Sequence, residues 1–172
     1  MGTARNFVSA HPTMMMSSTE FAELYEDHYA AVYSTALRVT GNPSDAEDVL
    51  QTVFLRVLAQ GDRLHPEPLP EAYFRRAAAN AAVDIIRRKI SHAETPLDHA
   101  ISYPSKESPA LLKERLRRAI ARLDQDDASL FLMRYVEGYS NEELAGMFHQ
   151  EKNNIAVRLH RIRQSLQIEM ER

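Results

Sequence analysis

Side chains suited to contacts with DNA recur between residues 152 and 163, near the end of the chain. Asparagine can pair with adenine through two hydrogen bonds, small apolar side chains can contact a thymine methyl group, and cationic side chains can bind phosphates. A shorter periodic segment, residues 141–148, comes first, so the two segments together have the pattern of a helix–turn–helix. An exposed face that only meets water would have the same composition, and this segment alone does not decide between the two. The candidate DNA contacts are Lys152, Asn153, Asn154, Ala156, Val157, Arg158 and Arg161.

The other face of the segment after residue 152 is apolar and is the side expected to pack. Its apolar residues follow one another at spacings of four, three and four, which predicts one stripe along a helix. Ser140 and Glu143 have the spacing of a capping box, so a shorter helix is expected to start there. A turn near residues 149–151 then separates the two helices. The residues expected to pack are Ile155, Leu159, Ile162 and Leu166.

A second group of polar side chains lies between residues 75 and 89, where five basic side chains accompany one acidic side chain. On a helix, spacings of four and seven bring several of them close to one stripe. Arginine could bind phosphates there, while asparagine and aspartate could contact base edges. An ion pair between Asp84 and Arg88 within the helix is the alternative for those two. The candidates are Arg75, Arg76, Asn80, Asp84, Arg87 and Arg88.

Two aromatic residues, Tyr73 and Phe74, precede this basic group. Aromatic rings can stack on unpaired bases. They can equally pack in a protein core, and we expect at least one of the two to do so.

The charges alternate along the 172-residue chain, whose net charge is −3. Residues 1–60 contain three basic and seven acidic side chains, and residues 128–151 contain one basic and four acidic side chains. Residues 152–172 reverse the balance, with five basic and two acidic side chains. This alternation is compatible with two contacts to DNA and an acidic surface that meets a basic protein.

Several classes of function have no matching pattern in the sequence. The chain has no cysteine, which excludes disulfides and thiolate metal sites, and it has no HExxH motif. No Ser–His–Asp spacing, glycine-rich phosphate loop or pair of catalytic carboxylates is convincing. No apolar run approaches the roughly 20 residues that a membrane span needs. We therefore expect no enzyme activity, no cofactor or metal, no small-molecule substrate and no direct membrane insertion.

The sequence predicts an all-α protein, because it has only five glycines and no alternating β-branched runs. Gly41 suits a left-handed cap after the first helix, and Ser44 is expected to cap the second helix with Glu47 as its capping-box partner. A proline-rich tract of little apolar content follows the third helix and predicts a flexible linker. The expected parts are a disordered tail (1–17), a three-helix domain (18–91), a linker (92–108) and a four-helix domain (109–172). Their helices are expected over roughly 18–40, 44–59, 70–90, 110–123, 126–138, 141–148 and 152–166.

Two blocks of the chain resemble conserved regions of bacterial sigma factors. The tract LRVTGNPSDAEDVLQTVFLRVL resembles the second conserved region, and PEAYFRRAAANAAVDIIRRK resembles the helix that follows it there. The tracts LMRYVEGYSNEELA and RLHRIRQSL resemble the fourth conserved region. The blocks occur in the expected order and are joined by one short linker. This layout resembles that of the extracytoplasmic-function (ECF) group of the sigma-70 family.

The resemblance implies that the protein binds core RNA polymerase and directs transcription from specific promoters. The third helix, with the loop between Gln60 and Pro70, would then bind the −10 element and capture an extruded base. The last helix would bind the −35 element. The resemblance also implies control by an anti-sigma factor and a cytoplasmic location, at the nucleoid when active or at the membrane when a membrane-bound anti-sigma factor holds the protein. Contacts with the clamp helices of the largest polymerase subunit would come from Asp45, Asp48, Gln51 and Thr52.

The chain departs from the family pattern at several of these positions. His149 and Gln150 stand in the turn where the family usually has a small residue followed by an apolar one. Ala156 and Val157 stand where Lys-Ser is common, and Thr52 stands where an acidic residue is common. The preferred promoter sequence therefore cannot be taken over from the family.

Two other functions remain compatible with the sequence. An autonomous helix–turn–helix regulator would bind an operator as a dimer, without polymerase, although the sequence offers no spare heptad seam for dimerisation. A sigma-like decoy would bind an anti-sigma factor without binding promoters. Transcription that depends on both a promoter and core polymerase would distinguish a sigma factor from either alternative.

Overall fold

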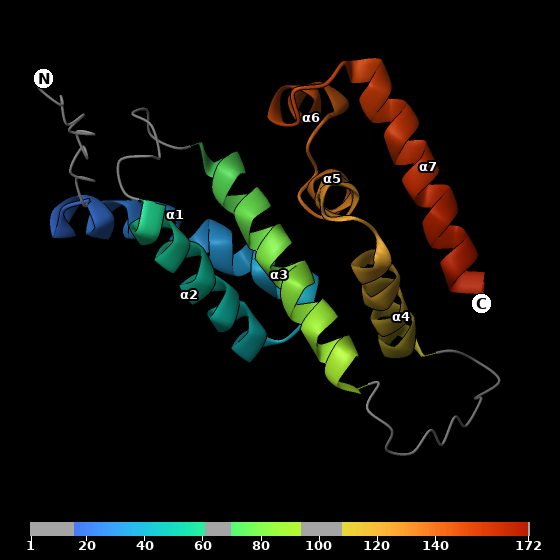
Figure 1. The fold of residues 1–172 in the computed structure, drawn as a ribbon, viewed down its shortest axis with the longest axis horizontal. Coiled ribbons are helices and arrows are strands. Elements are labelled where there is room, and N and C mark those ends of the chain that lie inside the picture. Colours follow the sequence, from blue (N-terminus) through green and yellow to red (C-terminus); the bar gives the residue numbers. More distant parts are fainter. Residues whose placement is uncertain (1–15, 61–69, 94–107, 172) are drawn as a thin grey trace, which may run out of the picture.

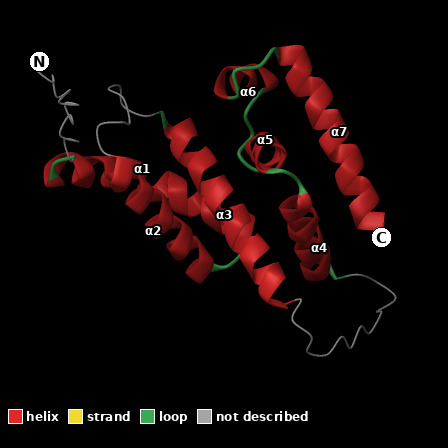
Figure 2. Ribbon diagram, in the orientation of Figure 1, coloured by secondary structure: helices red, strands yellow, loops and turns green. Residues whose placement is uncertain are grey.

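The computed structural model describes residues 16–60, 70–93 and 108–171. Within these residues it contains seven helices and no strand (Figures 1 and 2), which confirms the all-α fold class. Parts of the expected tail (1–15), loop (61–69) and linker (94–107) lie outside the described residues. The helices are α1 (Ser18–Thr40), α2 (Pro43–Gln60), α3 (Glu71–Ala93), α4 (Pro109–Arg122), α5 (Gln125–Tyr135), α6 (Asn141–Met147) and α7 (Lys152–Glu171).

Helices α1, α2 and α3 pack on one another and form the first domain. Its core combines valines of α1 and α2 with a run of alanines on α3, whose small side chains allow the helices to approach closely. Phe74 is fully buried, and its ring centre lies 5.9 Å from that of Phe54. Tyr73 is half-buried. The expectation that at least one of this aromatic pair packs in the core is confirmed.

Of the two helix caps predicted at the turn between α1 and α2, the structure confirms one and contradicts the other. Gly41 has a φ of 68°, the left-handed conformation expected of a glycine cap. Ser44, however, does not cap α2. The helix already begins at Pro43, and the Asn42 side-chain oxygen accepts hydrogen bonds from the backbone N–H groups of Ser44 (2.9 Å) and Asp45 (3.2 Å). Proline suits the first helical position because its ring presets φ and it has no N–H that needs a partner.

Helices α4 to α7 form the second domain, in which α7 contacts α4, α5 and α6. The apolar stripe expected on the last helix is confirmed, because all four of its residues are buried. They pack with the buried side chains of α5 and with Leu144 of α6. The capping box of Ser140 and Glu143 is present in front of α6, and α6 and α7 are joined by the tight turn of a helix–turn–helix.

The first half of α4 is largely exposed. The exposed fractions of Leu112 and Leu116 are 47% and 36%. Buried residues of α4 occur only in its second half, where it packs against α3 and α7. Leu116 instead borders a pocket of about 220 Å³ whose walls come from α1, α3, α4 and α5.

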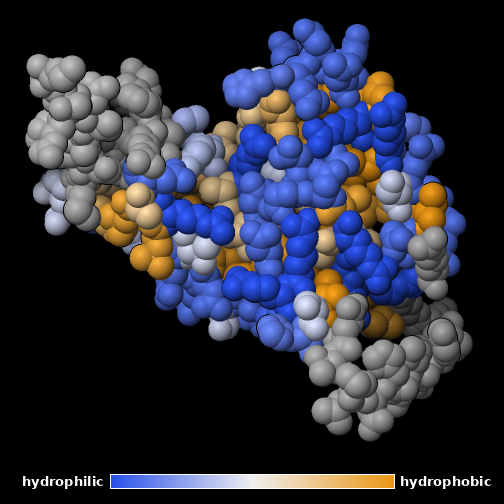
Figure 3. Space-filling model, viewed as in Figure 1, coloured by the Kyte–Doolittle hydropathy of each residue, from blue (hydrophilic) through white to orange (hydrophobic). Residues whose placement is uncertain are grey.

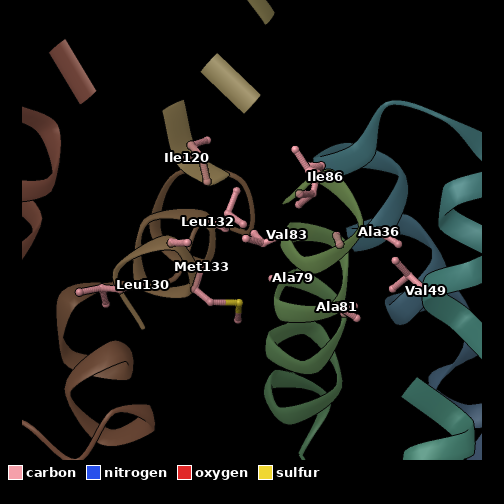
Figure 4. Packing of buried hydrophobic residues seen from close by; sticks show 14 of the residues in the cluster. Ala36, Val49, Ala79, Ala81, Val83, Ile86, Ile120, Leu130, Leu132 and Met133 are labelled. Carbon is pink, nitrogen blue, oxygen red and sulfur yellow. The ribbon is translucent and has the colours of Figure 1, made fainter. Parts of the chain in front are cut away.

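The two domains share one continuous buried cluster. Helix α3 contacts both α4 and α5, and Figure 4 shows Val83 of α3 beside Leu132 of α5. Ile86 and Ile120 lie near the same junction. The polar face of α3 therefore lies at the boundary between the domains, and this position decides what its side chains can bind.

Candidate nucleic-acid interface

The outer face of α7 presents most of the expected DNA contacts to solvent. Six of its seven candidates are exposed, and Val157 has an exposed fraction of 51%. Lys152 lies 3.5 Å from Glu142, and both side chains remain largely exposed. Because the inner face of α7 is buried in the core, the helix has the two-sided character that a recognition helix requires. The exposed candidates are Lys152, Asn153, Asn154, Ala156, Val157 and Arg161.

Arg158 is the exception on this face, because it is half-buried and bound within the protein. Its Nε atom donates to the Asp127 carboxylate at 2.5 Å, and its Nη2 atom lies 3.8 Å from Asp124. A hydrogen bond from the backbone N–H of Asp127 lowers the pKa of Asp124, and Arg158 adds to this shift. Burial raises the pKa of Asp127. Arg158 thus ties α7 to the start of α5, a role that the sequence did not indicate.

The turn before α7 places His149 in the left-handed region, with a φ of 52°. Among the described residues it is the only one other than glycine with a positive φ. The backbone N–H of Gln150 donates to the carbonyl oxygen of Ala145 at 2.9 Å and closes the turn. This conformation gives a physical reason why a glycine is favoured at the position of His149.

Three of the six expected −10 contacts on α3, the side chains of Arg75, Arg76 and Arg87, bind the second domain. Arg75, whose side chain is 19% exposed, donates to the Glu137 carboxylate at 2.7 Å and to the Thr35 hydroxyl at 3.2 Å. It also pairs with Glu71 one turn earlier on the same helix. Although burial lowers the pKa of Arg75, its bonds to Glu71 and Glu137 outweigh burial and raise that pKa above its ordinary value.

Arg76 reaches the helix–turn–helix. Its Nη1 atom donates to the carbonyl oxygen of Met147 at 3.0 Å, and its guanidinium lies 4.0 Å above the ring centre of Phe148. A guanidinium at this distance from a ring is attracted by the negative face of the π system. Arg76 also lies 3.5 Å from Asp126, so its guanidinium contacts both the start of α5 and the end of α6 in the second domain.

Arg87 binds the segment between α4 and α5. It donates to the carbonyl oxygens of Ala121 (2.8 Å) and Leu123 (2.7 Å) and to the side-chain oxygen of Gln125. Asp84 lies 3.4 Å from Arg87, so within α3 the structure pairs Asp84 with Arg87 and not with Arg88, the alternative considered above.

Asn80 and Arg88 complete the set on α3. The backbone oxygen of Asn80 accepts a hydrogen bond from Gln125 at 3.2 Å, and its side-chain oxygen is buried without a hydrogen-bond partner. Arg88 is exposed. Of the six candidates, Arg88 is thus the one whose side chain is exposed, and the five others are partly covered.

A pocket of about 290 Å³ opens between α2 and α3, next to Gln60, where α2 ends. It combines an apolar floor with arginine, amide and phenol groups, which is a suitable lining for a planar polar ring. Its lining residues are Val53, Arg56, Val57, Gln60, Tyr73, Arg76, Ala77 and Asn80.

The expected polymerase contacts on α2 divide into two groups. Asp48 and Gln51 are exposed, and Thr52 is half-buried, with its hydroxyl bonded to the carbonyl oxygen of Asp48 at 2.8 Å. Asp45 is only 8% exposed and pairs with Lys89 of α3 at 2.6 Å. The outer face of α2 therefore presents Asp48, Gln51 and part of Thr52, while Asp45 mainly joins two helices.

Comparison with known protein families shows that the two domains match two regions of one family. A family model described as Sigma-70 region 2 matches residues 24–90, and one described as Sigma-70, region 4 matches residues 113–166. The chain belongs to the sigma-70 family. The expected resemblance is thus confirmed, and the two matched segments correspond to α1–α3 and α4–α7.

Named relatives place this sigma-70 protein in the ECF group. It is 28% identical over 152 residues to "ECF RNA polymerase sigma factor SigE" of Mycolicibacterium smegmatis, covering 84% of this chain and 59% of that protein. It is also 28% identical over 146 residues to "RNA polymerase sigma factor CarQ" of Myxococcus xanthus, covering 82% of this chain and 83% of CarQ. The chain thus spans less than two thirds of SigE but most of CarQ.

A solved structure has a similar fold. The structure of CnrH in complex with the cytosolic domain of CnrY matches with a TM-score of 0.52 and 19% sequence identity, covering 90% of each chain. Among the described residues of this sigma-70 protein, no helix is long and apolar enough to span a bilayer. The same residues contain no group of three potential metal ligands.

Three structural features of this sigma-70 protein near its candidate sites were not indicated by the sequence. Glu137 and Gln125 bind side chains of α3 across the domain boundary, over sequence separations of 62 and 38 residues, and no local pattern announces such contacts. Leu55 is 63% exposed on α2, beside Gln51 and Asp48. Figure 3 shows hydrophobic surface towards the end of α2. Leu55 could have been found as an apolar residue of α2 that lies outside the helical face formed by its buried residues.

Proposed function

We propose that this member of the sigma-70 family is an alternative sigma factor that binds core RNA polymerase and directs transcription from specific promoters. One observation carries the proposal: α7 turns a face of six exposed polar and small side chains to solvent while its other face is buried. It does so in a chain whose two halves match regions 2 and 4 of the family. The role requires binding and strand separation, not bond chemistry.

Recognition of the −35 element is assigned to α7. Asn153 and Asn154 stand at its first turn, where side chains of a recognition helix meet base edges. Ala156 and Val157 add apolar contacts suited to thymine methyl groups, and Arg161 lies in reach of phosphates. Arg158 holds α7 against α5 through its ion pair with Asp127.

Recognition of the −10 element is assigned to α3 and to the pocket between α2 and α3. The pocket is supported as the site of an extruded base by its polar and aromatic lining and by the unpaired side-chain oxygen of Asn80. Unstacking a base costs a few kcal/mol, which contacts inside such a pocket offset. The loop expected to assist in this capture lies mostly outside the described residues.

Docking on core polymerase is assigned to the outer face of α2. Asp48 and Gln51 supply acidic and polar groups, and the exposed Leu55 supplies apolar area next to them. A face of this composition suits the basic and apolar surface of a helical protein partner, here the clamp helices of the largest polymerase subunit. Asp45 contributes indirectly by holding Lys89.

Control by an anti-sigma factor and a cytoplasmic location, at the nucleoid when active, complete the proposal. The pocket bordered by Leu116 offers an inhibitor an apolar surface, with Arg38, Lys113 and Arg117 around it and no acidic side chain among the described residues that line it. An inhibitor that carries carboxylates around an apolar anchor would fit this surface. A membrane-bound inhibitor would hold the protein at the membrane without any insertion of its own.

The test is transcription in vitro with core bacterial RNA polymerase, this protein and a library of promoter fragments, followed by sequencing of the RNA. Start sites that share a pair of motifs at a fixed spacing are expected. Binding to core polymerase without any transcript would favour the decoy, for which the covered face of α3 is the supporting observation. Absence of any binding to core would favour the autonomous regulator.

A further inference from the structure

The pocket of about 220 Å³ bordered by Leu116 has an apolar floor. Branched side chains from three helices form much of this floor, among them Ile86 of α3, Ile120 of α4 and Leu132 of α5. All three are buried, and they lie near one another in Figure 4. Leu116, which is 36% exposed, forms part of the wall on the solvent side. Such a lining favours a hydrocarbon chain, because the main gain inside it is the burial of apolar surface.

Three cationic side chains also line the pocket. Lys113 is exposed, and no carboxylate of the described residues pairs with it. Arg117 is held in place because its Nε atom donates to the carbonyl oxygen of Val39 at 3.0 Å, while its Nη1 atom lies 3.8 Å from Glu114. Arg38 forms an ion pair with the second domain, yet its side chain remains 46% exposed. Since the floor is buried and these side chains are partly exposed, the positive charge lies at the mouth of the pocket.

We propose that this pocket binds an amphipathic monoanion with one unbranched alkyl chain, of the class of medium-chain carboxylates. The alkyl chain occupies the apolar floor, and the carboxylate meets Lys113 and Arg117 at the mouth. Pockets for small molecules commonly combine an apolar lining with a few placed polar groups in this way. A neutral hydrocarbon would leave the cations without a partner, and an inorganic anion would leave the floor empty.

The inference goes beyond the proposed function, because it concerns a small molecule whose binding can be measured without transcription. The walls of the pocket come from α1, α3, α4 and α5, so the site exists only in the folded chain. A ligand that binds the folded chain alone raises the temperature of unfolding. An inhibitor that uses the same surface and this small anion exclude each other.

The first experiment is isothermal titration calorimetry of the full-length wild-type protein with hexanoate, octanoate, decanoate and dodecanoate, each below its micelle concentration. One binding site per chain is expected. Each further methylene that enters the floor should tighten binding about fourfold, until the alkyl chain outgrows the pocket and the affinity levels off. A continuous rise without a plateau, or several weak sites, would show adsorption to the surface and would overturn the inference.

Two further ligands separate the charge of octanoate from its chain. Octanol has the chain without the charge and should bind about tenfold more weakly, whereas acetate has the charge without the chain and should not bind detectably. Added salt should weaken the binding of octanoate but not that of octanol, because salt screens the charges at the mouth. Equal affinities for octanol and octanoate would contradict the assignment of an anion.

The role of the cationic mouth is tested with Lys113→Gln. This exposed substitution should weaken octanoate binding about two- to fivefold, the usual range for an exposed ion pair, and leave octanol binding unchanged. The matched control is Arg118→Gln, because Arg118 is an exposed cation of the same helix, pairs with Glu114 and does not line the pocket. A loss of octanoate binding that is equal in the two variants would reflect net charge and not this site.

The apolar wall is tested with Leu116→Ser and its matched control Leu112→Ser. Both leucines are exposed on α4, one turn apart, but only Leu116 lines the pocket. Leu116→Ser should weaken the binding of octanoate and of octanol about fivefold, and Leu112→Ser should change neither. Circular dichroism checks that each variant is folded, and the wild-type series decides the matter without any variant. If none of the straight-chain carboxylates binds the wild type, or if the two leucine variants behave alike, the inference is wrong.

Discussion

Arg158 and Arg161 lie three residues apart on α7, yet their surroundings give them different roles. Arg158 is half-buried against Asp127, whereas Arg161 is exposed on the outer face. We expect Arg158→Ala to lower the free energy of unfolding by about 1.5–3 kcal/mol, the usual range for a hydrogen bond to a charged group. Arg161→Ala should leave stability unchanged and weaken binding to −35 DNA. Urea denaturation and DNA affinity, measured on both variants, would contradict this assignment if the two effects were exchanged.

His149 adopts a conformation that costs a residue with a Cβ atom about 1 kcal/mol. Glycine would remove this cost, although its greater freedom in the unfolded chain offsets part of the gain. His149→Gly is therefore expected to raise the free energy of unfolding by roughly 0.5 kcal/mol, as measured by thermal or urea denaturation. A loss of stability would mean that the imidazole makes contacts that outweigh the backbone conformation.

The capping box at the start of α6 gives a pH dependence of known sign. The backbone N–H of Ser140 donates to the Glu143 carboxylate at 2.8 Å, and this bond lowers the pKa of Glu143 below its ordinary value of 4.5. Because the folded pKa is the lower one, the contribution to stability is present above pH 4.5 and disappears as the pH falls through the folded pKa. Carboxyl NMR should show a titration midpoint below 4.5, and Ser140→Ala should move it upwards.

At the scale of elements, α7 separates folding from recognition on its two faces. Leu159→Ala should destabilise the protein by about 2–5 kcal/mol, because it leaves a cavity under a buried side chain. Val157→Ser lies on the exposed face and should leave the unfolding transition in place while changing the preferred −35 sequence. A comparison of unfolding midpoints with the promoters selected from a library checks both. Equal destabilisation by the two substitutions would argue against a free outer face.

The elements themselves were largely predictable, because each helix depends on local patterns. The first two helices were predicted to within a residue at each end, whereas α7 continues five residues beyond its expected end at residue 166. Gly41 marked the end of α1 and Ser140 the start of α6 correctly. The errors have local causes as well. Asn42 competes with Ser44 as a cap once Pro43 occupies the first helical position, and α4 is longer than the surface that it covers, which leaves Leu112 exposed.

At the scale of the whole molecule, the sequence did not indicate how the domains meet. Arg75 and Glu137 are 62 residues apart in sequence, and neither periodicity nor capping relates them. The candidate residues on α3 were selected for their donors, and those same donors suit carboxylates and carbonyl oxygens as well as phosphates. Side-chain chemistry therefore indicated which residues of α3 offer hydrogen-bond donors, while the packing of the domains shows which groups those donors bind in the structure.

Arg76 and Asn80 contact the second domain in the structure and are assigned to the −10 element in function. The decisive measurement compares the wild type with the double variant Arg76→Ala/Asn80→Ala in core polymerase binding and in promoter-dependent transcription, with Arg118→Ala as the exposed control. Core binding should persist in all three proteins, and transcription should be lost only in the double variant. If transcription were instead kept or increased, these residues would serve only to hold the domains together, and the assignment of α3 to promoter recognition would be wrong.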